Sequence, residues 1–282
     1  MVRQLKLLIV EGNTKEARDH AVSFGMLTQS ANYAKTLKAI RPDLKIDFIF
    51  PTDGELPGHD VDEISAYDGI VFTGSSLHAY DTDADVLCQI ELMKACFSAG
   101  SQIFGSCWGM QVAVVAAGGS VAPNVRGREI GVARRIKVEA EGQSHPLFRN
   151  KSSLFDAVSI HLDHVTKLPS EAVLLASNAM SEMQAIAMNI GTAEFWGVQY
   201  HPEFDLSYIA GVFRRYAEMM LNEGFVASPA DLERLIGDYT RLQEVGDTGL
   251  AWRYGLGADV LDSCSRTQEI ANWLEKISAL DK

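Results

Sequence analysis

The feature that most constrains the fold of this chain is a Gly-Ser-Cys-Trp-Gly segment at residues 105–109, which lies between two short apolar runs. An apolar run, a tight turn and a second apolar run are typical of a strand that turns sharply into a helix and exposes the central side chain. Glycine suits both flanking positions because a side chain there would clash between strand and helix. The first turn of the helix would favour a thiolate at Cys107. Cys107 is therefore a candidate nucleophile; the alternative is a small buried cysteine at a strand end.

Apolar runs and helical spacings alternate over the first half of the chain. Buried strands are expected at residues 5–10 and 67–74, an alternating strand at 45–50 and a further strand at 101–104, with helices at 26–40, 81–99 and after Cys107. This alternation predicts an α/β fold with a mostly parallel, flavodoxin-like central sheet that carries helices on both faces. Sites in such sheets form at the carboxyl ends of the strands, so we expect Gly74 and Cys107 to face one pocket.

The pattern changes after residue 129 to short strand-like runs, which predict a small antiparallel or mixed portion of sheet. These runs lie at residues 130–138, 154–160, 173–177, 183–188 and 194–199, followed by helical spacing at 205–221, 228–245 and 267–280, with a Gly-rich turn region at 246–257. We expect residues 1–222 to form one domain and residues 223–282 to form a helical C-terminal extension. Amphipathic helices of this kind pack on their own domain or form the interface of a homodimer.

The composition excludes several classes of function. The chain has 282 residues and a net charge of -12, with no block of basic residues, which argues against a nucleic-acid or anionic-membrane surface. No window approaches the roughly 18 apolar residues of a membrane span, and the first ten residues do not resemble a signal peptide, so a cytoplasmic location is expected. The four cysteines show no CxxC pairing or zinc-ligand spacing. We expect neither a metal nor an organic cofactor.

A thiolate nucleophile needs a base and a group that orients the base. His201 is the best candidate, because it follows an apolar strand and Pro202 fixes the backbone between it and Glu203. A carboxylate at that position can hold the imidazole and stabilise its charged form. The alternative is a loop histidine beside a solvated glutamate. Four other histidines are interpreted as surface or structural residues: His20, His59, His78 and His145.

Five motifs follow one another along the chain. They are Gly-Ser-Ser at 74–76 with Tyr-Asp at 80–81, Gly-Ser-Cys-Trp-Gly-Met-Gln at 105–111, Gly-Arg-Glu-Ile-Gly at 127–131, His-Leu-Asp-His-Val at 161–165 and Trp-Gly-Val-Gln-Tyr-His-Pro-Glu at 196–203. In type and order they resemble the motifs of the class I (triad) glutamine amidotransferases, especially the stand-alone branch similar to the amidotransferase domain of GMP synthase. The resemblance covers about residues 5–220.

The resemblance implies a role for each matching residue. Cys107 would attack the side-chain amide of glutamine to give a γ-glutamyl thioester and ammonia, His201 would shuttle the proton, and Glu203 would orient His201. The backbone N–H groups of Ser75 and Trp108 match the oxyanion positions of the family. Substrate-binding positions are matched by Gly74, Gln111, Arg128, Glu129, His161 and Asp163. For His161 and Asp163, a loop held by its own side-chain bonds is the alternative.

Two positions depart from the family pattern. The oxyanion loop is Gly-Ser-Ser where much of the family has Gly-Gly-Pro, and a serine at 75 need not impair a backbone donor. Met110 stands where the GMP-synthase branch often has histidine. Because Met110 is three residues from Cys107 in the chain, we expect it to bear on the choice of substrate or partner.

These observations leave three functions open. The leading one is hydrolysis of the γ-amide of L-glutamine, with ammonia passed to a separate synthase or acceptor subunit, because no Gly-rich phosphate loop follows residue 220. The second is a γ-glutamyl hydrolase or peptidase that acts on γ-glutamyl amines or peptides. The third is a non-catalytic binding protein on the same fold. Pocket depth beyond the γ-amide would separate the first two.

Overall fold

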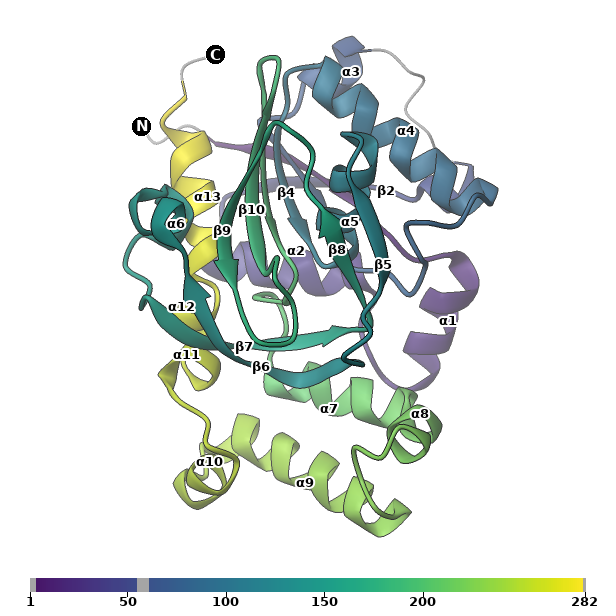
Figure 1. Cartoon of the computed structure of the whole chain (residues 1–282), viewed down its shortest axis with the longest axis vertical. Coiled ribbons are helices and arrows are strands. Elements are labelled where there is room, and N and C mark those ends of the chain that lie inside the picture. The colour runs from purple at the N-terminus through teal and green to yellow at the C-terminus, as the bar shows by residue number, and fades with distance from the viewer. Residues whose placement is uncertain (1–3, 55–60, 281–282) are drawn as a thin grey trace.

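A nine-stranded sheet runs through the centre of the computed structural model, which describes residues 4–54 and 61–280 (Figure 1). Its strands are β1 (Lys6–Val10), β2 (Lys45–Ile49), β3 (Gly69–Phe72), β4 (Gln102–Ser106), β6 (Glu129–Val138), β7 (Leu154–His161), β9 (Ala172–Ser177), β10 (Ala185–Ile190) and β11 (Ala193–Val198). They follow one another in the order β2-β1-β3-β4-β11-β10-β9-β6-β7. The strands from β2 to β11 are parallel, and the pairs from β11 to β7 are antiparallel.

The parallel half has the flavodoxin-like order that the sequence predicted. The loops after β1 and β3 diverge at the point where the strand order reverses, which is where ligands bind in such sheets. The strand β11, expected in the antiparallel or mixed part, is the one that joins the two parts, because it pairs antiparallel with β10 and parallel with β4. Because of this pairing, residues that follow β11 and residues that follow β4 emerge at the same edge of the sheet.

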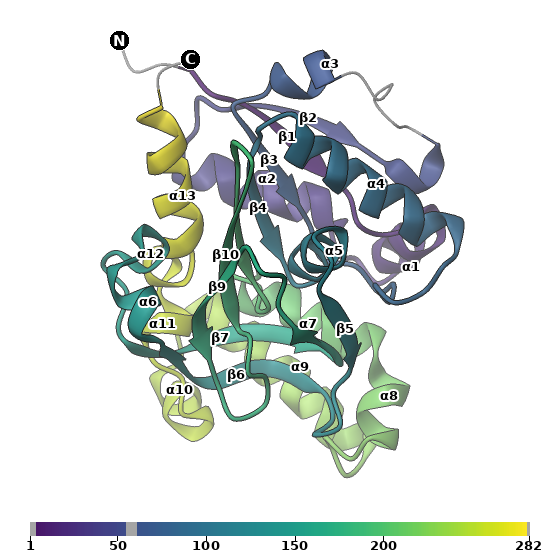
Figure 2. The ribbon, with the colours of Figure 1, turned by 45° about the horizontal axis from the view of Figure 1, so that its top comes forward.

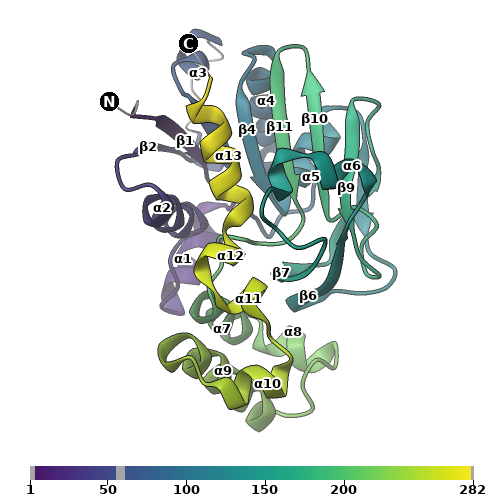
Figure 3. The same ribbon diagram turned by 90° about the vertical axis from the view of Figure 1, so that its left-hand side faces the viewer.

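Both faces of the inner parallel strands β1, β3 and β4 are covered, as continuous apolar runs require, whereas the edge strand β2 is largely exposed. In β1, Leu7 and Ile9 point to one face, which is packed by α2 (Gln29–Ile40) and α13 (Gln268–Ser278). Leu8 and Val10 point to the other face, which is packed by α4 (Ala84–Ser98) and α5 (Trp108–Ala116). Figure 3 shows α13 running alongside the sheet near β1 and α2.

A further group of helices covers the carboxyl-end side of the sheet. The lower part of Figure 1 shows α7 (Leu206–Arg215), α8 (Ala217–Asn222), α9 (Pro229–Val245) and α10 (Thr248–Tyr254), and α1 (Lys15–Ser23) lies at its right-hand side. In Figures 1 and 2, β6 and β7 run across the lower ends of β9 and β10 and lie between these strands and the helices. Residues of α7 and α9 form a third apolar core with Val158 of β7.

Several short elements complete the chain. Two strands, β5 (Ser120–Pro123) and β8 (Asp163–Lys167), pair antiparallel in a small second sheet. Short helices are α3 (Val61–Ser65), α6 (Ala140–Ser144), α11 (Ala258–Leu261), α12 (Ser263–Arg266) and the 3-10 turns Pro51–Asp53 and Pro146–Phe148. No helix within residues 4–54 and 61–280 is both long enough and apolar enough to cross a membrane.

Four predictions about helices were wrong. The helix expected at 205–221 breaks at Tyr216 into α7 and α8, and α1 lies where no helix was expected, so His20 is helical. The Gly-rich region at 246–257 contains α10, because Asp247 caps the start of this helix and Gly255 ends it in a left-handed conformation. The spacing within 81–99 predicts Leu87 on one apolar stripe with Ile90, Met93 and Phe97, but Leu87 of α4 is exposed. The sequence also predicts a turn-rich connection at 51–58, which lies partly outside the described residues, and His59 lies outside them too.

The C-terminal helices pack on the rest of the chain. Trp273 of α13 lies against Gly69 of β3 and contacts Phe104 of β4 with a ring separation of 5.8 Å. Leu232 and Ile236 of α9 are buried in the core that α7 shares. The division at residue 222 stays a prediction, and α13 adds apolar side chains to the same core as β1.

Candidate active site

Cys107 occupies the strained turn that the sequence predicted. It is the N-cap of α5 with φ 51° and ψ -102°, a backbone conformation that costs a non-glycine residue about 1–3 kcal/mol. A side-chain carbon on Gly105 would lie 2.7 Å from the backbone of Gly109, and one on Gly109 would lie 2.5 Å from the carbonyl oxygen of Phe72. Glycine is therefore required at both positions. Cys107 is buried at the amino end of α5, where helix N–H groups favour negative charge.

His201 and Glu203 form a buried pair next to this turn. His201 Nδ1 lies 2.7 Å from Glu203 Oε1, and both side chains are almost fully buried. Phe204 stacks on the imidazole with a centroid distance of 4.0 Å and an interplanar angle of 5°. The other carboxylate oxygen of Glu203 accepts a 3.1 Å hydrogen bond from Ser106, which is bonded to Tyr33. These contacts fix the carboxylate and the ring in one orientation.

The electrostatics of the site favour a charged imidazole. Burial by itself lowers the pKa of His201, but the negative charge of Glu203 and the hydrogen bond to the Cys107 thiol outweigh it and raise this pKa to about 10. A proton on His201 is the state that can stabilise a neighbouring thiolate and later be given to a leaving amine. The site thus combines a thiol, a proton carrier and an orienting carboxylate.

Two backbone N–H groups beside Cys107 are available to bind an oxyanion. Neither the N–H of Ser75 nor that of Trp108 has an acceptor among residues 4–54 and 61–280. The loop that carries Ser75 is held by Asn13, whose side-chain oxygen accepts from the backbone N–H of Ser76 at 3.0 Å. The indole of Trp108 is anchored separately by a 2.8 Å bond to Gln89. Donors fixed in this way need little reorganisation during a reaction.

A cavity of about 230 Å³ opens beside the thiol. Seven of the predicted site residues line it: Ser75, Cys107, Gln111, Arg128, His161, Asp163 and His201. The other four lie directly behind this wall. Gly74 packs against the ring of His201, Glu203 supports the same ring, Glu129 contacts His161, and Trp108 begins α5.

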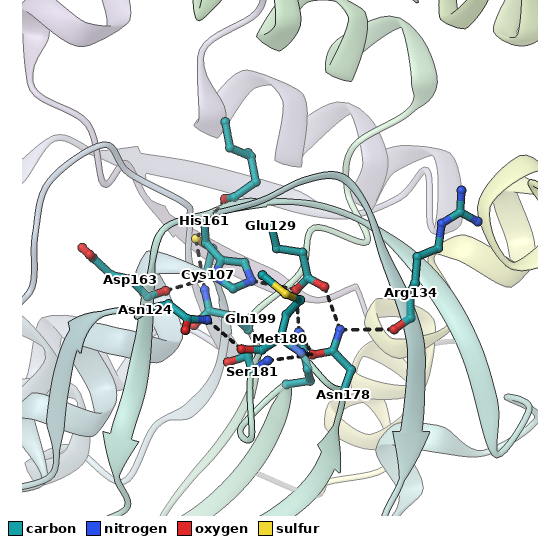
Figure 4. Close-up of polar contacts among 12 residues, drawn as sticks. Cys107, Asn124, Glu129, Arg134, His161, Asp163, Asn178, Met180, Ser181 and Gln199 are labelled. Carbon is teal, nitrogen blue, oxygen red and sulfur yellow. Dashed lines mark hydrogen bonds and ion pairs between the residues drawn. The ribbon is translucent and has the colours of Figure 1, made fainter. Parts of the chain in front are cut away.

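His161 is held by a buried polar network (Figure 4). Its Nε2 lies 3.0 Å from Glu129 Oε2, and its Nδ1 lies 3.0 Å from the backbone oxygen of Asp163. Glu129 also accepts hydrogen bonds from Asn178 and Gln184, both at 2.7 Å. The two amide donors hold the buried carboxylate in place, and contacts at both ring nitrogens hold the imidazole, so His161 presents a fixed face to the cavity.

Two charged residues at the cavity have partners. Asp163 Oδ2 lies 2.6 Å from His78 Nδ1, and the guanidinium of Arg128 forms two hydrogen bonds to Glu223. His78 was interpreted as a surface or structural residue; it is partly exposed, and it also lines the cavity and holds Asp163. Its position four residues after Gly74, in the loop that follows β3, was a signal that could have placed it there.

The sequence missed other residues of the site. Gln199 donates a 3.4 Å hydrogen bond to the sulfur of Cys107, and its carbonyl accepts from Gln111. Gln29 lines the cavity, although nothing in the sequence pattern sets it apart from other helix-start residues. Met110 was expected to influence the choice of substrate or partner, but it is fully buried next to Gly197 and does not line the cavity. Side chains in the first turn of α5 point to different sides, and Met110 faces the core.

Comparisons with known proteins agree with this geometry. The sequence model of the family described as glutamine amidotransferase class-I matches residues 34–211. The chain belongs to this family. Of the class-I members, it is 33% identical to the γ-glutamyl-L-1-hydroxyisopropylamide hydrolase of a Pseudomonas species, over 98% of this chain and 94% of that protein. It is 26% identical to γ-glutamyl peptidase 3 of Arabidopsis thaliana, over 63% of this chain and 70% of that protein.

Other matches include a GMP synthase and a solved structure of a glutamine amidotransferase. The GMP synthase of Aeromonas salmonicida is 36% identical over 115 residues, which is 38% of this chain and 21% of that protein. Among solved structures, a glutamine amidotransferase from Thermotoga maritima aligns with a TM-score of 0.70 at 15% identity and covers 99% of this chain and 100% of that chain. This likeness extends over the class-I fold and the C-terminal helices of the present chain.

Proposed function

We propose that this class-I family member hydrolyses γ-glutamyl amides of small amines to glutamate and the free amine, with Cys107 as the nucleophile. The observation that carries the proposal is the juxtaposition of Cys107, at a strained helix start, with the buried His201–Glu203 pair on the wall of one cavity. The relative that covers nearly the whole chain is named for the hydrolysis of one such amide.

In the proposed mechanism the proton of the thiol already lies on His201 before the substrate binds, because the pKa of His201 is raised, and the thiolate sulfur of Cys107 bonds to the γ-amide carbon. The oxygen, now negatively charged, is bound by the N–H groups of Ser75 and Trp108. The bond between carbon and nitrogen breaks as His201 gives its proton to the amine, which leaves a γ-glutamyl thioester. Water then loses a proton to His201 and attacks the thioester, which releases glutamate and returns Cys107 as a thiolate beside the protonated His201.

The shape of the cavity supports an amide with a substituent on nitrogen. The leaving nitrogen has to lie next to His201, because His201 protonates it. Phe204 stacks on the ring of His201 and contacts Tyr208, and both line the cavity wall together with the apolar side chains of Met26 and Val212. A glutamine γ-amide has no group that would use this wall, whereas a short alkyl group on the nitrogen would contact it.

Hydrolysis of L-glutamine itself is the second candidate. Similarity to GMP synthases over the nucleophile region supports it, since those proteins are described as glutamine-hydrolysing. In that case the leaving group is ammonia, and a separate acceptor protein would use it. The catalytic steps are the same for both candidates, so the difference lies in the group on the nitrogen.

The test is glutamate release by the purified chain from L-glutamine and from γ-glutamyl methylamide, ethylamide and isopropylamide. We expect kcat/KM to be higher for the alkylamides, and to vanish in Cys107→Ala. Cys264→Ser is the matched control, because this cysteine is exposed and outside the cavity. Preference for L-glutamine would favour the second candidate, and release that persists in Cys107→Ala would contradict both.

A further inference from the structure

The side chain of Gln29 lies next to the reacting groups and has no role in the mechanism above. Its carboxamide nitrogen is 3.6 Å from the point where a side-chain carbon of Gly74 would stand. The ring of His201 comes within 2.7 Å of the same point. Gln29 and His201 therefore converge on one face of Gly74, at the wall of the cavity that contains the thiol.

The carboxamide of Gln29 is not used within the protein. Its oxygen Oε1 is buried and has no hydrogen-bond partner in the described part of the chain. Buried polar atoms of folded proteins are nearly always paired, so an unpaired acceptor at a cavity wall is available to a bound ligand. No hydrogen bond fixes which carboxamide atom faces the cavity, and a half-turn about the last side-chain bond exchanges them.

We infer that Gln29 accepts a hydrogen bond from the N–H of the scissile amide and so binds the departing amine. The inference rests on the function proposed above and assigns a residue to the leaving-group side of that reaction. The leaving nitrogen must be within reach of His201 to be protonated. The carboxamide of Gln29 lies on that side, and a half-turn that exchanges its two atoms brings the unpaired oxygen to the position of the nitrogen.

The contact has a chemical consequence. When the sulfur of Cys107 bonds to the carbonyl carbon, the amide nitrogen becomes tetrahedral and gains a lone pair, which must face His201 to take its proton. Holding the N–H at Gln29 fixes rotation about the bond between carbon and nitrogen and directs the lone pair toward His201. A γ-glutamyl ester has no N–H and cannot use this contact.

The experiment compares γ-glutamyl methylamide with the γ-methyl ester of glutamate, which differ only in the leaving atom. In Gln29→Leu we expect kcat/KM to fall about tenfold for the amide, the effect of one lost hydrogen bond, and to stay within about twofold for the ester. Gln29→Glu keeps acceptor oxygens and loses the donor, so its ratio of amide to ester activity should stay near that of the wild type.

Equal losses on both substrates in Gln29→Leu, or no loss on either, would overturn the inference while wild-type activity stays intact. If the ratio of amide to ester activity falls in Gln29→Glu as much as in Gln29→Leu, the assignment of Gln29 as an acceptor is overturned. Wild-type protein that hydrolyses neither compound would overturn the proposed function and this inference with it.

Discussion

The substitution Glu203→Gln tests how the orienting carboxylate acts. Glutamine keeps an oxygen that can accept from His201 Nδ1 but removes the negative charge that holds the pKa of His201 at about 10. With that pKa, about 99% of the imidazole is protonated at pH 8. Without the charge, burial, the largest single effect, lowers the pKa of His201 and is opposed by the contact with the thiol. An imidazole with the ordinary pKa of about 6.5 is about 3% protonated at pH 8.

The expected loss of kcat/KM is therefore about 30-fold at pH 8 and less than about twofold at pH 6. The assay is glutamate release from γ-glutamyl methylamide between pH 6 and pH 9.5, with Glu218→Gln, an exposed residue of α8, as the control. A loss of the same factor at both pH values would mean that Glu203 positions the ring without setting its charge, and would refute the reasoning.

The raised pKa of His201 also predicts a pH-dependent stability. Because the folded-state pKa of His201, about 10, lies above its unfolded value of about 6.5, its contribution to the free energy of unfolding is fully present below pH 6.5. It is lost as the pH rises toward 10. Gly109→Ala should lower the free energy of unfolding by about 1–3 kcal/mol because of the clash with β3, whereas Gly237→Ala, which meets nothing within 4 Å, should raise it by up to about 1 kcal/mol. Lys151→Met leaves the fully buried Glu269 without its cation and should cost about 3–5 kcal/mol, with recovery in the double variant with Glu269→Gln. Urea unfolding at pH 6 and pH 9.5 measures the free energy of unfolding for all three predictions. The first would be contradicted if this free energy did not fall between pH 6 and pH 9.5, and the second if the two alanine variants changed it equally. A loss below about 1 kcal/mol in Lys151→Met would contradict the third.

The parallel strands could be predicted from sequence because burial on both faces leaves continuous apolar runs. The strands expected at 5–10 and 101–104 were both recognised in this way. The pairing of β11 with β4 could not be predicted, because the residues of a short strand-like run do not indicate whether the neighbouring strand is parallel or antiparallel. That pairing is nevertheless what brings His201 to Cys107.

The candidate site was predictable where chemistry and motif coincide. Cys107 follows a strand within a glycine-flanked turn, and His201 precedes a proline and a carboxylate. The one signal for His78 was its position four residues after Gly74, which could place it near the cavity but could not show that it faces a carboxylate on another loop. Gln199 and Gln29 could not be assigned to the site by the same route, since their roles depend on which strands and helices converge in three dimensions.

The packing of α13 has a consequence for how the chain is made. Trp273 completes the apolar face beside Phe104, but it is synthesised 166 residues after Cys107. At about 5–20 residues per second, the delay is on the order of ten seconds. During this interval the nascent sheet carries an uncovered apolar face and a thiol on a turn that has not yet been locked. We expect the newly made chain to depend on chaperones until α13 has left the ribosome.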